Sequence, residues 1–141
     1  MRQLVTSDRK RVADWVAEKI GCRPWPDDTA ALGLEENGEL VGGVVLDGYM
    51  ARGCGSLHCA GVGKHWLNRQ FLLAVFDWCF NQLDLKVLLN RVSGANAASL
   101  RFTEHVGFSQ LARFPKAWDG ENDLVLFELR RENCRWIEGG R

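Results

Sequence analysis

The sequence lacks the features that mark membrane-spanning, secreted and strongly charged proteins. No apolar run is both long enough and uncharged enough to span a bilayer, and the first ten residues lack the apolar core of a signal peptide. Lys and Arg together number 18, as do Asp and Glu, so no overall field attracts nucleic acid or an anionic membrane. These absences predict a cytoplasmic protein with neither a membrane nor nucleic acid as its main partner.

The cysteines are few and follow no ligand or disulfide pattern. The five thiols form no C-x-x-C pair, and their odd number argues against a complete disulfide framework. We therefore assign no metal ligand and expect most of the thiols to be buried: Cys22, Cys54, Cys59, Cys79 and Cys134.

The composition that is present is typical of a globular protein. The 141 residues are 46% apolar and 26% charged, which suits one domain with a sizeable core. We expect this domain to span residues 1–141, with residues 130–141 as a C-terminal tail that either packs on the body or stays partly loose.

Hydrophobic periodicity and turn residues predict alternating helices and strands. A cap at Ser7 or Asp8 begins a helix that Gly21 ends, and Asn37-Gly38 is a strong two-residue hairpin signal. The remaining predicted elements are strands at 30–36, 39–46 and 56–62, a helix at 67–83, a strand at 86–92, a helix from 96, and strands at 109–114 and 124–129. This order predicts a mixed sheet with helices on its faces.

Residues 96–108 join a helix start, an amphipathic helix and a forced stop in thirteen positions. Asn96 is a good N-cap and Ser99 lies one turn further on, at a helix end that attracts anions and carbonyl groups. Gly107 can adopt the left-handed conformation that ends a helix, and Phe108 anchors the exit. Helical spacing predicts one buried face, at Ala98, Phe102 and Val106. An ordinary capped helix joined to a strand would also explain this pattern.

The pattern N-x-x-S, a short helix and then Gly-Phe resembles the last conserved motif of the GNAT superfamily of acyl-CoA-dependent N-acyltransferases. The resemblance covers roughly residues 1–130. It implies an α/β (α+β) fold with a mixed, mostly antiparallel central sheet, helices on both faces and a splayed strand pair. It also implies acetyl-CoA (CoA) as the cofactor, lying between the splayed strands with Asn96 and Ser99 near its pantetheine arm.

The second motif of that family, R-G-x-G-x-G/A, is degraded in this chain. Matching Leu72-Leu73 to the family's usual leucine pair puts Lys64 at the arginine position. The three small residues are then replaced, by His65, Leu67 and Arg69. The resemblance implies cofactor binding by two glycines with a permissive backbone and by three side chains that can hold phosphate: Gly61, Gly63, Lys64, His65 and Arg69. A solvated helix cap without a ligand is the alternative for each of them.

Acetyl transfer to an amine sets three chemical tasks. The amine must lose a proton, the thioester carbonyl needs a hydrogen-bond donor, and the departing thiolate needs a proton. The resemblance assigns the second task to a backbone N–H near Cys59. The family's usual proton donor, a Tyr four residues before the Gly-Phe, is Thr103 here, and the one tyrosine of the chain, Tyr49, lies in an earlier loop.

His58 is the candidate general base, because it is the nearest titratable group on that strand and its unperturbed pKa is about 6.5. The alternative is a hydrogen-bonded histidine inside the core, because strand register decides where the ring points. Cys59 beside His58 resembles a nucleophile pair, but adjacent strand residues point to opposite faces. Direct attack by the amine on bound acyl-CoA, in a ternary complex, is therefore the simpler mechanism.

The acceptor amine is expected over the hairpin loops, the first helix and the segment 115–123, with Trp25 and Trp118 as walls. Five carboxylates would favour a cationic amine if they line the cleft, although such loops are more often solvated surface: Asp27, Asp28, Asp119, Glu121 and Asp123.

The sequence therefore predicts an N-acetyltransferase that moves an acetyl group from acetyl-CoA to a primary amine. One alternative is a catalytically inactive GNAT-fold module that binds acyl-CoA or another partner, which the degraded glycine loop and the missing Tyr favour. A nucleic-acid or protein interaction domain is a third reading, suggested by six tryptophans and the basic residues 9–11 but weakened by the balanced charge. The tryptophan content permits a homodimer, and no residue requires one.

Overall fold

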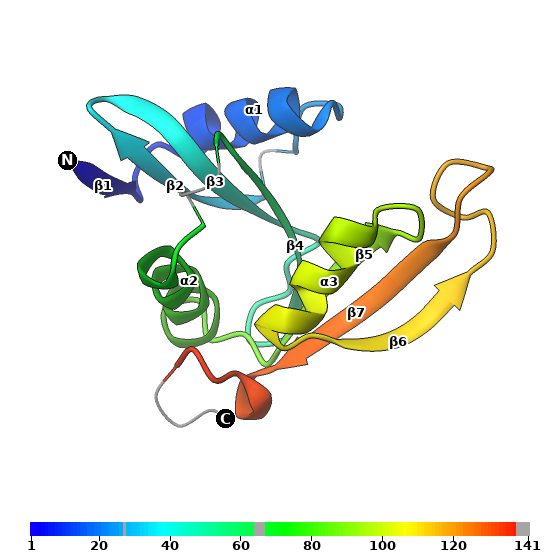
Figure 1. Cartoon of the computed structure of the whole chain (residues 1–141). Helices are drawn as coiled ribbons and strands as arrows, with labels where there is room; N and C mark the ends of the chain where they lie inside the picture. Colours follow the sequence, from blue (N-terminus) through cyan, green and yellow to red (C-terminus); the bar gives the residue numbers. More distant parts are fainter. Residues whose placement is uncertain (27, 64–66, 138–141) are drawn as a thin grey trace.

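The computed structural model describes residues 1–26, 28–63 and 67–137, which form a seven-stranded mixed sheet with helices on both sides (Figure 1). In spatial order the strands are β1 (Arg2–Val5), β2 (Ala30–Glu36), β3 (Glu39–Asp47), β4 (Cys54–Gly61), β5 (Val87–Ser93), β7 (Leu124–Arg130) and β6 (Ser109–Phe114). Within this sheet the neighbours β4 and β5 run parallel and the other neighbours run antiparallel. The predicted fold class is thereby confirmed.

Strand β1 is absent from the sequence prediction. Its four residues pair with β2 at the edge of the sheet, from Arg2 opposite Glu36 to Val5 opposite Gly33. The Asn37-Gly38 hairpin has positive φ angles at both positions, as its type of turn requires, and the Asn37 N–H donates to the Met1 carbonyl. So short a strand has no periodicity of its own and is defined by its partner.

Helix α1 (Arg9–Ile20) covers one face of the sheet and ends at Gly21, whose φ of 72° is left-handed. Its buried side chains, Val12 and Val16 among them, pack with residues such as Val45 and Ala60. A Cβ atom at Gly43 would lie 2.8 Å from the Val16 side chain, so the absent side chain lets α1 approach the strand closely.

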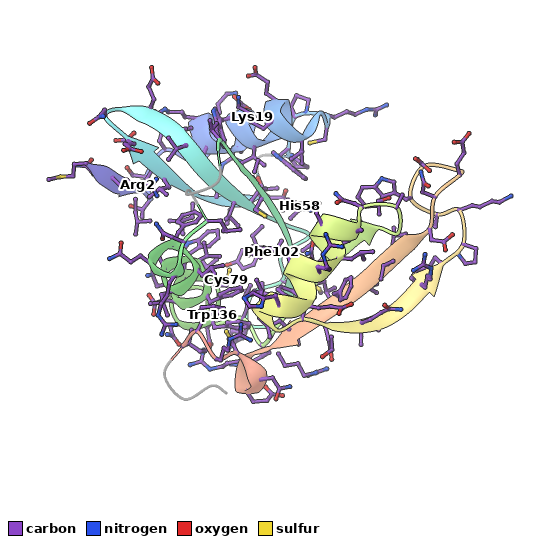
Figure 2. The ribbon with its side chains drawn as sticks, viewed as in Figure 1. Arg2, Lys19, His58, Cys79, Phe102 and Trp136 are labelled. Carbon is purple, nitrogen blue, oxygen red and sulfur yellow. The ribbon has the colours of Figure 1, made fainter. Side chains whose placement is uncertain are left out.

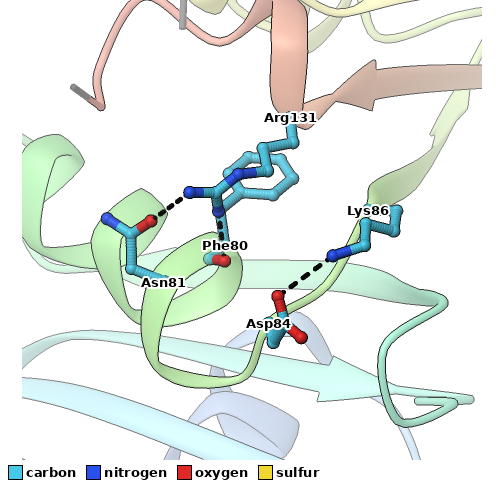
Figure 3. Close-up of polar contacts among 5 residues, drawn as sticks. All are labelled: Phe80, Asn81, Asp84, Lys86 and Arg131. Carbon is cyan, nitrogen blue, oxygen red and sulfur yellow. Dashed lines mark hydrogen bonds and ion pairs between the residues drawn. The ribbon is translucent and has the colours of Figure 1, made fainter. Parts of the chain in front are cut away.

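Helix α2 (Arg69–Phe76) covers the opposite face and continues as a π-helical turn, Asp77–Gln82. The wide turn is tied at its start, because the Asp77 carboxylate accepts hydrogen bonds from the side chains of Asn81 and Gln82. Its end is tied by Arg131, which donates to the carbonyl of Phe80 and to Asn81 (Figure 3). The helix predicted over 67–83 is therefore confirmed, with a π-helical second half.

Helix α3 (Ala97–Val106) begins and ends where the sequence predicts, but its buried face is different. Thr103 and Val106 are buried, whereas Ala98 is exposed and Phe102 is 36% exposed. The prediction of a buried face through Ala98 and Phe102 is therefore wrong: Phe102 borders a cavity, and the buried side of α3 runs through Thr103 and Val106.

The C-terminal segment packs back on the body as far as Ile137. The Trp136 indole N–H donates to the Val106 carbonyl (2.8 Å), and Arg135 donates to the His105 carbonyl (2.6 Å). Cys134 and Ile137 are buried in the same cluster as α2. These bonds satisfy carbonyl groups at the end of α3, which have no partners within the helix.

Within the described ranges, no helix has the length and apolar character needed to cross a membrane.

Candidate functional site

Strands β4 and β5 pair over a short stretch and then separate. Their register runs from Cys54 opposite Val87 to Ser56 opposite Leu89, although β4 continues to Gly61 and β5 to Ser93. On its other side β4 stays paired with β3 from Ser56 to Gly61, past the point where β5 separates. The parallel pair is thus splayed, as the GNAT resemblance implies.

A pocket of about 490 Å³ occupies this opening. Its lining comes from β4, β5, α2, α3, the segment after α1 and the β6–β7 loop. Two of the lining residues, His58 on β4 and Phe102 on α3, are labelled in Figure 2. A hollow of about 510 Å³ also lies outside α1, but its charged side chains include Arg11, which pairs with Glu35, and Lys19, which lies over the Trp15 ring.

The backbone of β4 presents polar groups to the opening. The Val62 N–H donates to the Val41 carbonyl at 2.9 Å. Along an antiparallel ladder, hydrogen-bonded residue pairs alternate with pairs that are not hydrogen-bonded. It follows that the backbone N–H and C=O groups of His58 and Ala60 face β3, whereas the backbone groups of Cys59 face β5. Because β5 has already separated at that level, the Cys59 N–H points into the gap.

The pocket passes through the sheet. Successive side chains on β4 alternate, so Cys59 lies on the α2 face with its partner Val44, and His58 lies on the α1 face with its partner Val45. Both His58 and Cys59 nevertheless line the same pocket. The pocket therefore reaches both faces of the sheet, and we call its two ends the α1-face mouth and the α2-face mouth.

His58 sits at the α1-face mouth without a hydrogen bond at Nε2. Its ring lies 4.7 Å from the Trp25 ring, centroid to centroid, and Nε2 is 3.9 Å from an Asp47 oxygen. Burial lowers the pKa of His58; the Asp47 carboxylate opposes this shift and the Arg91 guanidinium adds to it. At neutral pH the imidazole is accordingly uncharged and able to accept a proton.

The thiols divide between core and pocket. Cys79 and Cys134 are buried, whereas Cys22 and Cys59 are exposed and line the pocket. The expectation that most thiols are buried is wrong, because only two of the five are buried: Cys54 is half-buried, and Cys22 and Cys59 lie at the opening. Desolvation by the neighbouring protein raises the pKa of Cys59 to about 11, although its side chain is exposed to the pocket. A thiolate nucleophile is therefore disfavoured at neutral pH.

Asn96 and Ser99 both line the pocket at the start of α3. The Asn96 side-chain oxygen accepts the Ser99 backbone N–H at 3.1 Å, so Asn96 caps the helix. Thr103, at the position of the family's usual Tyr, is 3% exposed and accepts a hydrogen bond from Asn90 (3.3 Å). That bond attaches α3 to β5 beside the pocket.

The predicted phosphate loop is only partly described. Lys64 and His65 lie outside the described residues. Gly63 has a φ of 74°, which only glycine adopts readily, and Gly61 ends β4; neither is among the pocket-lining residues that the structure describes. Arg69 begins α2, with its guanidinium 5.9 Å from the Trp136 ring centroid.

The predicted acceptor walls, Trp25 and Trp118, both line the pocket. The predicted carboxylates do not: Asp119 accepts hydrogen bonds within its own loop, and Asp123 pairs with Arg113 at 2.7 Å. Asp28 and Glu121 are also absent from the described lining, and Asp27 lies outside the described residues.

Two lining residues of β5, Asn90 and Arg91, were not predicted from the sequence. The one signal that could have found them is a polar pair inside an otherwise apolar strand, Val87–Ser93.

Comparison with known proteins supports the fold. No protein-family model and no curated protein sequence matches the chain. Among solved structures, a mutant of the spermidine N-acetyltransferase SpeG from Vibrio cholerae has a TM-score of 0.75 at 14% identity, over 97% of this chain and 96% of that one. The yncA protein of Salmonella typhimurium, solved with its cofactor acetyl-CoA, has a TM-score of 0.66 at 17% identity, over 92% and 93%.

A ribosomal-protein alanine N-acetyltransferase from Escherichia coli has a TM-score of 0.65 at 16% identity, over 92% of this chain and 94% of that one. At such identities the likeness concerns the path of the chain. The splayed β4–β5 pair, the capped α3 and these neighbours agree, and the chain has the fold of the GNAT N-acyltransferases.

Proposed function

We propose that this protein is an N-acetyltransferase that moves an acetyl group from acetyl-CoA to a primary amine by direct attack in a ternary complex. The observation that carries the proposal is the pocket between β4 and β5, which is lined by residues on both faces of the sheet. Two reactants that enter from opposite faces can meet at its centre, and such positioning supplies a large share of the acceleration in bimolecular reactions. The neighbouring acetyltransferase structures support the same chemistry.

The residues of the α2 and α3 face fit a coenzyme. The Cys59 N–H faces the gap and can donate to a carbonyl oxygen, while Asn96 and Ser99 line the pocket beside it. The phosphate groups of the coenzyme can bind at the start of α2, which carries Arg69, and at the loop glycines Gly61 and Gly63. We propose that Lys64 and His65 add charge there. When bound, acetyl-CoA would supply the activated acyl group.

The residues of the α1 face suit the amine. His58 is uncharged at neutral pH, and its Nε2 is buried without a partner, so it can take a proton from an ammonium group. Trp25 and Trp118 form walls against which the acceptor can pack. Cys59 contributes its backbone, because its thiol stays protonated.

A turnover assay tests this proposal. The full chain is incubated with acetyl-CoA and a panel of primary amines, and the release of free CoA thiol is followed; mass spectrometry then identifies the acetylated amine. We expect amine-dependent release of CoA, together with a rise in melting temperature when CoA alone is added. Absence of both signals would overturn the proposal.

A second candidate is a GNAT-fold module that binds acyl-CoA without transfer. The observation that favours it is the bond between Asn90 and Thr103, which leaves the usual position of the proton donor occupied by a buried structural hydroxyl. A thermal shift with CoA and no turnover with any amine would support this alternative.

A further inference from the structure

Two side chains at the α1-face mouth, an imidazole and a guanidinium, lie opposite each other across the splay. Paired residues share a face, and the last pair is Ser56 with Leu89. Two positions further along each strand are His58 and Arg91, which therefore flank the opening on the same face. Both line the pocket.

Within the described part of the chain, the Arg91 guanidinium has no structural role that would occupy its N–H donors. Among the residues that the structure describes, no hydrogen bond or ion pair holds it. Arg131 and Arg135, by contrast, donate to backbone carbonyl groups, and Arg113 pairs with Asp123. A guanidinium that lines a pocket with its donors free is suited to bind a carboxylate, because its planar fork matches the two oxygens.

The rest of this mouth is apolar and aromatic. Ile20 of α1 and Trp25, whose ring contacts that of His58, line it, and Trp118 and Phe102 also line the pocket. Of the described residues that line the pocket, none is an aspartate or a glutamate. Asp47, the carboxylate nearest to His58, lies outside the lining, and its other oxygen accepts the Gly48 N–H. A polycationic amine would find one cation and no carboxylate along these described walls.

We propose, on the basis of the function proposed above, that the acceptor is an apolar or aromatic α-amino acid. Its amino group would face His58 on β4, its carboxylate would bind Arg91 on β5, and its side chain would pack between Trp25 and Trp118. The amino and carboxylate groups of an α-amino acid are joined to the same carbon, which matches two recognition groups on facing strands.

The step balances without a further reactant. The amine nitrogen forms a bond to the acetyl carbonyl carbon, the bond from that carbon to sulfur breaks, and the sulfur leaves with its electron pair. The proton that the ammonium group loses passes to His58. Arg91 takes no part in bond making, so its contribution is binding and orientation of the carboxylate.

The test compares acceptors that differ by the carboxylate alone. L-phenylalanine, phenethylamine, which lacks the carboxylate, and spermidine are assayed with acetyl-CoA for kcat and KM. Each amine is also titrated calorimetrically into the protein saturated with CoA. We expect L-phenylalanine to exceed phenethylamine by about ten- to a hundredfold in kcat/KM and in affinity, the range of a charge-assisted hydrogen bond.

Arg91→Gln should reduce that preference to about one, mainly through KM, while Arg91→Lys should retain part of it. Arg101→Gln is the matched control, because Arg101 is exposed on α3 and is not among the described lining residues. A preference for phenethylamine or spermidine, or an unchanged preference in Arg91→Gln, would overturn the inference and leave the transferase function intact.

If no amine is acetylated, the calorimetric titrations still test whether the pocket binds an α-amino acid. Binding that depends on both the carboxylate and Arg91 would support the α-amino acid site, although the proposed transferase function would then be contradicted. Equal binding of L-phenylalanine and phenethylamine, or binding of neither, would overturn the proposed α-amino acid site. Unfolding midpoints of the variants exclude a loss of fold as the cause.

Discussion

Two buried nitrogen atoms in the pocket have no hydrogen-bond partner in the described structure, Trp25 Nε1 and His58 Nε2. An unsatisfied buried polar group costs about 1–3 kcal/mol, so such groups are usually paired with protein or water. Both atoms belong to rings in contact at the α1-face mouth. The free protein therefore holds polar groups ready for a water molecule or a ligand.

The His58→Gln variant tests the proposed base. Because burial places the pKa of His58 below its usual value of about 6.5, the neutral form predominates at pH 7.5 and declines only at lower pH. We expect kcat/KM at pH 7.5 to fall by about a hundredfold or more, the usual contribution of a general base. The ratio of wild-type to variant activity should stay constant above pH 7 and shrink on acidification, as wild-type His58 takes up a proton.

His105→Gln serves as the control, because His105 is exposed near the end of α3 and outside the described lining. A ratio between wild type and His58→Gln that does not change with pH would contradict a role as base.

At the scale of elements, α3 is the part of the site that local sequence determines best. Its cap and stop signals are contained in residues 96–107, so its limits could be predicted to within about one residue. Its buried face could not, because the opening beside α3 is formed by β4, which lies far away in sequence. The phosphate end of α2 stays a prediction.

Asn96→Ala separates two roles of the α3 cap. Loss of the bond to the Ser99 N–H should reduce the free energy of unfolding by about 1 kcal/mol, as measured by urea denaturation. Asn96→Ser should retain most of that stability, because serine also caps helices. If the Asn96 amide contacts the coenzyme, calorimetry should show weaker CoA binding in both variants. Unimpaired binding in Asn96→Ser would restrict Asn96 to a structural role.

At the scale of the whole molecule, the splay of β4 from β5 creates the site. Helix α1 and helices α2 and α3 pack on opposite faces, and the strands separate only beyond Ser56 and Leu89 (Figure 1). The sheet on either side stays paired, through β3 and β7. The opening can therefore persist without loosening the sheet.

Amide hydrogen exchange reports the splay directly. In the free protein we expect the Cys59 N–H, which faces the gap, to exchange much faster than the His58 and Ala60 N–H groups, which face β3. Addition of CoA or acetyl-CoA should slow the exchange of Cys59 selectively, as measured by two-dimensional NMR. Equal protection of the three amides in the free protein would show that β4 and β5 are paired at this level.

Local sequence was enough to predict the order of the elements from α1 onward, the Asn37-Gly38 turn and the capped α3, because each depends on residues close together in the chain. It did not determine β1, which exists only as a partner of β2. Only the folded chain shows that His58 and Arg91 face each other and that the Cys59 N–H points into a gap. Those relations depend on strand register and on where pairing stops, and both are set by contacts between distant segments.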